Sequence, residues 1–315
     1  MMYTVEEIKE KLSNAGYMAS DDITFGASVA INLNRPIILE GAPGAGKTSL
    51  AKAVADALDL PLIRMQFYEG LTAEQILYDY DYQKQLLTIQ AISASLEDEL
   101  KNKTVDEAIH AVQGMDFYNR DFLIARPLMK AITSEKQCVL LLDEVDKSSE
   151  EVEHILLEFL EGYSISVPQL GTIQCDPEKK PIVFITSNCF RELSEPLKRR
   201  CGYLYIENKT EAELAEIIKS KIDLDTKLVK VIAKEVHSLQ NLTSLDQKPS
   251  TAEAIQCAEV LASGSTLRQA LLSLAKSKSD YKVIKKRVDK LYQEIEDDDS
   301  YDKRFEDYIS SESDD

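Results

Sequence analysis

The chain has 315 residues, of which 44% are hydrophobic and 29% charged, a composition typical of one large or two ordinary globular domains. Acidic residues outnumber basic ones 55 to 37, and the formal net charge of -18 argues against a generic binder of nucleic acids or anionic membranes, because both contacts depend on basic surfaces. We expect no membrane span and no signal peptide, and the 5 cysteines without CxxC spacing indicate reduced thiols, no zinc site and a cytoplasmic protein.

The first two thirds of the chain alternate helical patterns with short apolar runs, which predicts an α/β fold. Helices are expected over residues 5–12, 20–34, 47–60 and 150–160. Strands are expected over residues 36–40, 62–67, 139–142, 182–185 and 203–206, with a hairpin over 163–174. The glycine-rich residues 41–46 lie between the first strand and the third helix.

After residue 207 the pattern is helical only, with helices predicted from Thr210 onward and over residues 225–238, 250–262 and 266–276. The fold class predicted is therefore a P-loop αβα parallel-sheet domain followed by a small all-helical lid domain. The expected limits are 1–206 for the nucleotide-binding domain, 207–275 for the lid, 276–293 for a basic helix and 294–315 for an acidic, disordered tail.

Half of the net charge lies in the last 22 residues, where eleven acidic residues face two basic ones. Residues 276–290 just before it hold seven basic residues and two acidic ones. One interpretation is a solvated helix followed by a disordered tail. The other is a tail that folds back on the basic helix or docks on a partner.

Residues 41–48 match the pattern G-x-x-x-x-G-K-[ST] in full, between a predicted strand and a predicted helix. The glycines let backbone N–H groups converge on a phosphate, while Lys47 supplies an ammonium group to the phosphates and Thr48 a hydroxyl ligand to Mg²⁺. The pattern predicts a site for ATP with Mg²⁺. The nucleotide-binding residues expected are Gly41, Ala42, Pro43, Gly44, Ala45, Gly46, Lys47, Thr48 and Ser49.

Two acidic residues end the apolar strand predicted at 139–142. Asp143 is expected to join Thr48 in holding Mg²⁺, and Glu144 to polarise the water that attacks the γ-phosphate. This pair favours an ATPase over a small-molecule kinase, which needs room for an acceptor substrate.

Two further candidates for catalysis follow. Asn188 ends the strand predicted at 182–185 and is expected to hold the attacking water or the γ-phosphate. Arg199 and Arg200 lie just before the last strand, where a guanidinium can neutralise transition-state charge in a neighbouring subunit. Without the other motifs, a turn residue and a solvated basic turn would be the simpler interpretations.

In this order, these motifs resemble the AAA+ ATPases. The stretches LIRMQFYEGL (62–71), YDYQKQLL (80–87), RPL (126–128), DEVDK (143–147), PQLGTI (168–173), LKRRC (197–201) and KPS (248–250) are similar to the CoxD-like subgroup of the MoxR family. The resemblance covers about residues 3–276. It implies a ring-forming ATPase, commonly a hexamer, that remodels or matures protein partners, with a von Willebrand A-domain protein as helper.

The resemblance also assigns roles to single residues. It makes Arg200 the first candidate for the arginine finger and Arg199 the alternative. Gln66 stands where many AAA+ proteins keep a polar switch residue that restrains the catalytic glutamate, although a plain strand-edge glutamine is an equal interpretation. The chain departs from the family pattern at residues 249–253, which lack the usual lid arginine and leave Lys248 or Arg268 as substitutes.

Two other functions stay open at this point. One is a nucleic-acid motor or restriction-type subunit, against which stand the net charge and the lack of aromatic residues interleaved with a basic stripe. The other is a nucleotide-gated scaffold with little turnover. We therefore expect a homo-oligomer with protein partners, no nucleic acid and no membrane insertion.

Overall fold

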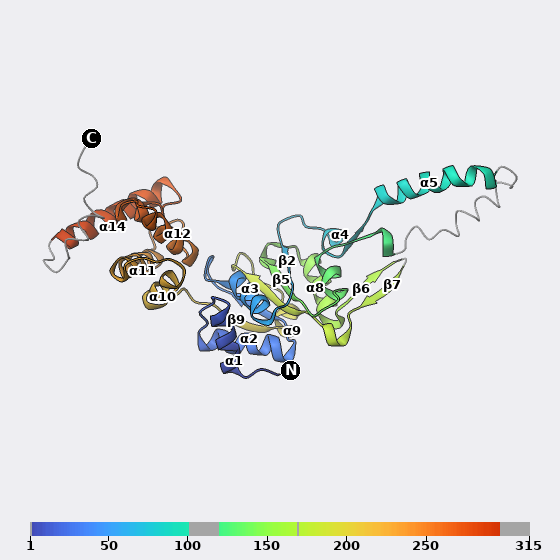
Figure 1. Cartoon of the computed structure of the whole chain (residues 1–315), viewed down its shortest axis with the longest axis horizontal. Helices are drawn as coiled ribbons and strands as arrows, with labels where there is room; N and C mark the ends of the chain where they lie inside the picture. The colour runs from blue at the N-terminus through green and yellow to red at the C-terminus, as the bar shows by residue number, and fades with distance from the viewer. Residues whose placement is uncertain (1, 101–119, 169, 297–315) are drawn as a thin grey trace. The chain divides into compact units, whose positions relative to one another are not determined.

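The computed structural model describes residues 2–100, 120–168 and 170–296 (Figure 1). The chain forms two compact units. The first unit comprises Met1–Ala15, Ala19–Glu40 and Thr48–Leu204, and the second comprises Gly16–Met18, Gly41–Lys47 and Tyr205–Asp315. The domain limits expected at residues 206, 275 and 293 stay predictions.

A five-stranded sheet with the order β2-β5-β8-β1-β9 forms the centre of the first unit. Its strands are β1 (Ile37–Glu40), β2 (Leu62–Gln66), β5 (Val139–Asp143), β8 (Ile182–Ser187) and β9 (Gly202–Tyr205). The pairs β2–β5, β5–β8 and β8–β1 are parallel. All residues of β5 and β8 are buried, which explains why both strands are continuous apolar runs. The strands predicted from the sequence are thereby confirmed.

The four helices predicted from the sequence in this unit are present, and a further short helix near residue 195 was not predicted. They are α1 (Val5–Asn14), α2 (Asp21–Leu33), α3 (Lys47–Leu58), α8 (Glu150–Gly162) and the short α9 (Glu195–Arg200). Thr4 and Glu7 form the predicted capping box of α1. The helix predicted over residues 47–60 ends earlier, at Leu58, because Asp59 takes a left-handed conformation with φ of 52°.

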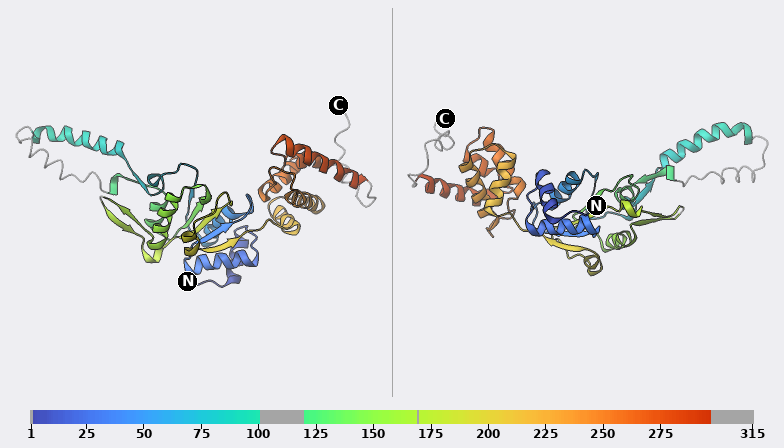
Figure 2. Two further views of the ribbon diagram at one scale, coloured as in Figure 1. Left: turned by 180° about the vertical axis from the view of Figure 1, so that it is seen from behind. Right: turned by 60° about the horizontal axis from the view of Figure 1, so that its bottom comes forward.

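The segment between β2 and β5 contains elements that the sequence did not predict. Its described elements are α4 (Ala73–Ile76), β3 (Tyr78–Tyr80), α5 (Tyr82–Leu100), η1 (Arg120–Phe122), β4 (Leu123–Ala125) and α7 (Pro127–Ile132). The strands β3 and β4 pair antiparallel. Both views of Figure 2 show α5, in cyan-green, projecting from the rest of this unit. The predicted hairpin is confirmed as β6 (Ser164–Val167) and β7 (Gly171–Gln174).

The long part of the second unit is helical, with α10 (Glu211–Lys221), α11 (Thr226–Gln240), α12 (Thr251–Ala262), α13 (Leu267–Leu272) and α14 (Lys278–Glu296). Buried aliphatic residues from all five helices form one core. Thr210 and Glu213 form the capping box expected at the first helix. Within the described ranges, no helix is long and apolar enough to cross a membrane.

The end of the chain differs from the prediction in two places. The helix expected over residues 266–276 stops at Leu272, because Ser273 caps its end and Ser277 accepts a hydrogen bond from Asp280 N at the start of α14. The basic helix extends to Glu296, three residues into the predicted tail. The rest of that tail, residues 297–315, lies outside the described residues.

Candidate active site

The glycine-rich loop of residues 41–47 belongs to the second unit. Gly46 has a φ of 102°, a conformation that disfavours any side chain, and a Cβ atom on Gly41 would lie 2.2 Å from the carbonyl oxygen of Ile206. Lys47 is 6% exposed, and its ammonium donates to the carbonyl oxygens of Gly41 (2.6 Å) and Ala42 (2.9 Å). The loop therefore holds a buried cation against its own backbone.

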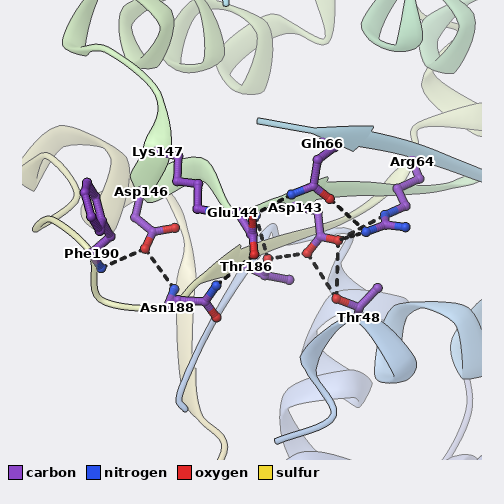
Figure 3. A network of polar contacts seen from close by, with 10 residues as sticks. All are labelled: Thr48, Arg64, Gln66, Asp143, Glu144, Asp146, Lys147, Thr186, Asn188 and Phe190. Atoms are coloured by element: carbon purple, nitrogen blue, oxygen red, sulfur yellow. Dashed lines mark hydrogen bonds and ion pairs between the residues drawn. The ribbon is translucent and has the colours of Figure 1, made fainter. Parts of the chain in front are cut away.

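Asp143, at the end of β5, is the centre of a polar cluster in the first unit (Figure 3). Its side chain is 4% exposed and accepts hydrogen bonds at both oxygens. Thr48 Oγ1 lies 3.1 Å from Oδ1 and 3.3 Å from Oδ2, and Thr186 Oγ1 donates to Oδ1 at 2.6 Å. The structure thus brings together Thr48 and Asp143, the two oxygen donors that the sequence predicts for Mg²⁺.

This donor set fits a magnesium site completed by nucleotide. Mg²⁺ prefers hard oxygen ligands and is usually held by one or two protein groups together with phosphates and water. Within the described part of the chain, no group of three or more His, Cys, Asp or Glu side chains could hold a metal by itself. One hydroxyl and one carboxylate would therefore hold such an ion only together with phosphate oxygens and water.

Glu144 follows Asp143 and takes a left-handed conformation, with φ 59° and ψ 47°. Its backbone N–H donates to Thr186 Oγ1 at 2.8 Å, so the turn is fixed to β8. Its carboxylate is contacted from three sides: Asn188 Nδ2 lies 3.0 Å from Oε1, while Gln66 Nε2 and Lys147 Nζ each lie 2.7 Å from Oε2. The hydrogen bond with Glu144 is the largest cause that raises the pKa of Lys147.

These contacts locate two residues named from the sequence. Asn188 lies against the carboxylate of Glu144, which is what a residue that orients a general base would do. Gln66 also contacts Glu144, as expected for a switch residue and unlike a plain strand-edge glutamine. The roles of both stay predictions.

Arg199 and Arg200 lie at the end of α9. Arg200 forms an ion pair with Glu161 of its own chain at 2.8 Å. Arg199 is exposed and forms no ion pair within the described residues. Both stay candidates for the arginine finger.

Three residues of the cluster were not predicted from the sequence. Arg64 donates to Asp143, Thr186 joins Asp143 to Glu144, and Asp146 accepts from the backbone N–H groups of Asn188 and Phe190 at 2.9 and 2.8 Å. The sequence held a signal for Arg64, since alternation along a strand places residues 64 and 66 on one face. The other contacts depend on strands that are distant in the sequence.

The comparison with protein families matches residues 36–201 to the AAA domain (dynein-related subfamily). The chain is 24% identical to the gas vesicle ATPase GvpN of Haloferax mediterranei over 252 residues, 77% of this chain and 67% of that protein. It is 24% identical to the chaperone protein ClpB of Mycoplasma pneumoniae over 194 residues, 60% of this chain and 22% of ClpB. The chain therefore spans about two thirds of GvpN and less than a quarter of ClpB.

Among solved structures, the Thermotoga maritima RuvB Holliday junction branch migration motor covers 90% of this chain and 68% of its own, with 18% identity and a TM-score of 0.44. The family match covers more than half of the chain and contains both the glycine-rich loop and the strand-end carboxylates. The chain belongs to the AAA domain family, dynein-related subfamily, and is an ATPase.

Proposed function

We propose that this ATPase binds ATP with Mg²⁺ and hydrolyses it in a homo-oligomeric ring, commonly a hexamer in the MoxR family, to remodel or mature protein partners. The observation that carries the proposal is the Glu144 carboxylate, held by Asn188 directly beside the buried Asp143. The arrangement supplies a base and a metal ligand on adjacent residues, as water attack on a phosphate requires.

Each residue has a role in this reaction. The loop N–H groups and Lys47 would bind the phosphates, and Thr48 and Asp143 would hold the metal. Bound Mg²⁺ neutralises negative charge on the phosphate oxygens. Glu144 orients the attacking water and accepts its proton, while Asn188 keeps the carboxylate in place. A neighbouring subunit's arginine, Arg199 or Arg200, stabilises the charge that develops.

The finer part of the proposal concerns what the ATPase acts on. The motifs of the CoxD-like subgroup support a remodeller that works with a von Willebrand A-domain protein, and the matched relative ClpB is named a chaperone. We also assign the protein to the cytoplasm, on the cysteine pattern of the sequence.

The test of the chemistry separates binding from turnover. Glu144→Gln is expected to keep its affinity for ATP and to lose turnover at least about 100-fold, because the base is removed while the phosphate loop is intact. Lys47→Ala is expected to lose ATP binding. Phosphate release and fluorescent-nucleotide binding measure the two effects, with Glu151→Gln, an exposed acid on α8, as the control. Wild-type turnover in Glu144→Gln would show that the base is another residue.

The test of the target uses the same variants. The Glu144→Gln variant, which stays loaded with ATP, is cross-linked in cells and purified. A protein that contains a von Willebrand A domain is expected to be recovered with it, and none with Lys47→Ala. Salt-sensitive binding of the wild-type protein to DNA or RNA in place of this partner would favour the nucleic-acid motor instead.

A further inference from the structure

Arg64 lies at the site proposed for the metal. It is on β2, an edge strand of the sheet, where alternation places Arg64 and Gln66 on the same face. The parallel register sets Gln66 beside Asp143, and Arg64 beside Leu141, which comes two residues before Asp143. The guanidinium therefore reaches forward along the strand toward the carboxylate of Asp143, as Figure 3 shows.

The contact between Arg64 and Asp143 is made to a single oxygen. Arg64 Nη2 lies 2.6 Å and Nε 3.0 Å from Asp143 Oδ2. Thr186 and the shorter contact of Thr48 go to the other oxygen, Oδ1. The Arg64 side chain is 53% exposed, while that of Asp143 is 4% exposed. The buried carboxylate is thus neutralised by a cation that has a path to solvent.

A metal ion held by Asp143 would compete with this guanidinium for the carboxylate. Magnesium binds a carboxylate oxygen directly at about 2.1 Å. Two N–H groups of Arg64 and the longer contact of Thr48 already lie on Oδ2, and a second positive charge would be repelled at this distance. Arrival of the metal therefore requires the guanidinium to move.

The same guanidinium is tied to the catalytic glutamate. Arg64 Nη2 also donates to Gln66 Oε1 at 2.8 Å, and Gln66 Nε2 in turn donates to Glu144 Oε2 at 2.7 Å. One chain of contacts thus joins Asp143 to Glu144 through two side chains of β2. Departure of Arg64 from Asp143 removes one of the contacts that hold Gln66 in this position.

We propose that Arg64 is a metal-site residue of this ATPase: its guanidinium neutralises Asp143 before nucleotide binds and is displaced by Mg²⁺, so that it sets the concentration of Mg²⁺ at which nucleotide binds tightly. The proposal rests on the assignment of Asp143 to the metal. It predicts opposite effects of removing Arg64 on metal affinity and on the stability of the protein without metal.

The experiment titrates Mg²⁺ into the full-length protein with a fluorescent ADP as probe. Arg64→Ala is expected to lower the half-saturating Mg²⁺ concentration about fivefold to tenfold, because a competing charge-assisted contact is lost. Arg64→Gln, which keeps a long polar side chain but no charge, should shift it in the same direction. The control is Arg126→Ala, which removes the Arg126–Asp79 ion pair in the same unit and should leave the titration unchanged.

The second measurement is thermal unfolding. In EDTA without nucleotide, both Arg64 variants should unfold at a lower temperature than wild type, because Asp143 is left buried and unpaired. Saturating Mg²⁺ with ADP should remove that difference. An unchanged half-saturating Mg²⁺ concentration, or a loss of stability that persists with Mg²⁺ and ADP, would overturn the proposal.

The wild-type titration tests the underlying assignment separately. If ADP binding by wild type ignores Mg²⁺, then Asp143 is not a metal ligand, and both the assignment and the role of Arg64 are wrong. If wild type responds to Mg²⁺ and the variants respond identically, only the role of Arg64 is wrong.

Discussion

Asp146 offers a test of how the catalytic side chains are positioned. It lies in the turn η2 (Val145–Lys147), two residues after Glu144, and is fully buried. Its Oδ2 accepts from the backbone N–H groups of Asn188 and Phe190 at 2.9 and 2.8 Å. We predict that Asp146→Ala releases the backbone at Asn188 and so misplaces the amide that contacts Glu144.

The size of the effect follows from these contacts. A hydrogen bond to a charged group contributes about 1.5–3 kcal/mol, and the gain from no longer burying a carboxylate offsets part of that sum. We therefore expect Asp146→Ala to lower the free energy of unfolding by about 2–4 kcal/mol. A misplacement of about 1 Å at Asn188 should lower kcat by about 10-fold to 100-fold. Asp146→Asn, which keeps an accepting oxygen, should recover most of both losses.

Urea unfolding followed by circular dichroism measures the stability, and phosphate release measures kcat. The control is Asp176→Ala, because Asp176 also accepts from a backbone N–H group, that of Glu178 at 3.0 Å, but is 47% exposed. It should lose about 1 kcal/mol at most. In an Asn188→Ala background, Asp146→Ala should lower kcat no further. An equal loss of kcat in both backgrounds would refute the view that Asp146 acts through Asn188.

Two further predictions concern groups on the surface and in the core. Arg199→Ala should lower turnover about 100-fold or more at unchanged ADP affinity. Arg200→Ala should lower it less than about 10-fold, because the Glu161 ion pair holds Arg200 within its own chain. Phosphate release over a range of protein concentrations measures both losses, and a larger loss in Arg200→Ala would make Arg200 the finger. In a thiol titration with Ellman's reagent at pH 8, Cys189 should react alone, as a single fast phase. Burial raises the pKa of the other four thiols and keeps them protonated. Cys189→Ser should remove the fast phase, and a fast phase that survives in this variant would contradict the reasoning.

The sequence predicted the central sheet well, because each of its inner strands is buried on both faces. Residues 139–142 and 182–185 have to be apolar throughout, and such a run ending in polar residues is visible without any partner strand. The segment between β2 and β5 was not predicted for the opposite reason. Its strands β3 and β4 have three residues each and pair across more than forty positions, so no local periodicity reveals them.

The residues of the candidate site likewise differ in whether local sequence patterns predict them. Lys47, Thr48, Asp143 and Glu144 occur in short local patterns, so the sequence alone predicts them. The contact of Arg64 with Asp143 depends on the register of two strands that are 79 residues apart at these positions. The end of the helix predicted over residues 266–276 was misplaced for a local reason, because apolar periodicity continues past Leu272 while the backbone contacts of Ser273 end the helix there.

The order of the strands gives the two sides of Glu144 different mechanical properties. Asn188 follows β8, which is hydrogen-bonded to β5 on one side and β1 on the other, so its backbone shifts only if two ladders are disturbed. Gln66 and Arg64 lie on β2, which has β5 as its one neighbour in the described sheet. Small displacements of β2 therefore cost fewer backbone hydrogen bonds. Glu144 is thus contacted on one side from a strand with two neighbours and on the other from a strand with one. Motion at this site should be concentrated in β2, where amide hydrogen exchange should be fastest.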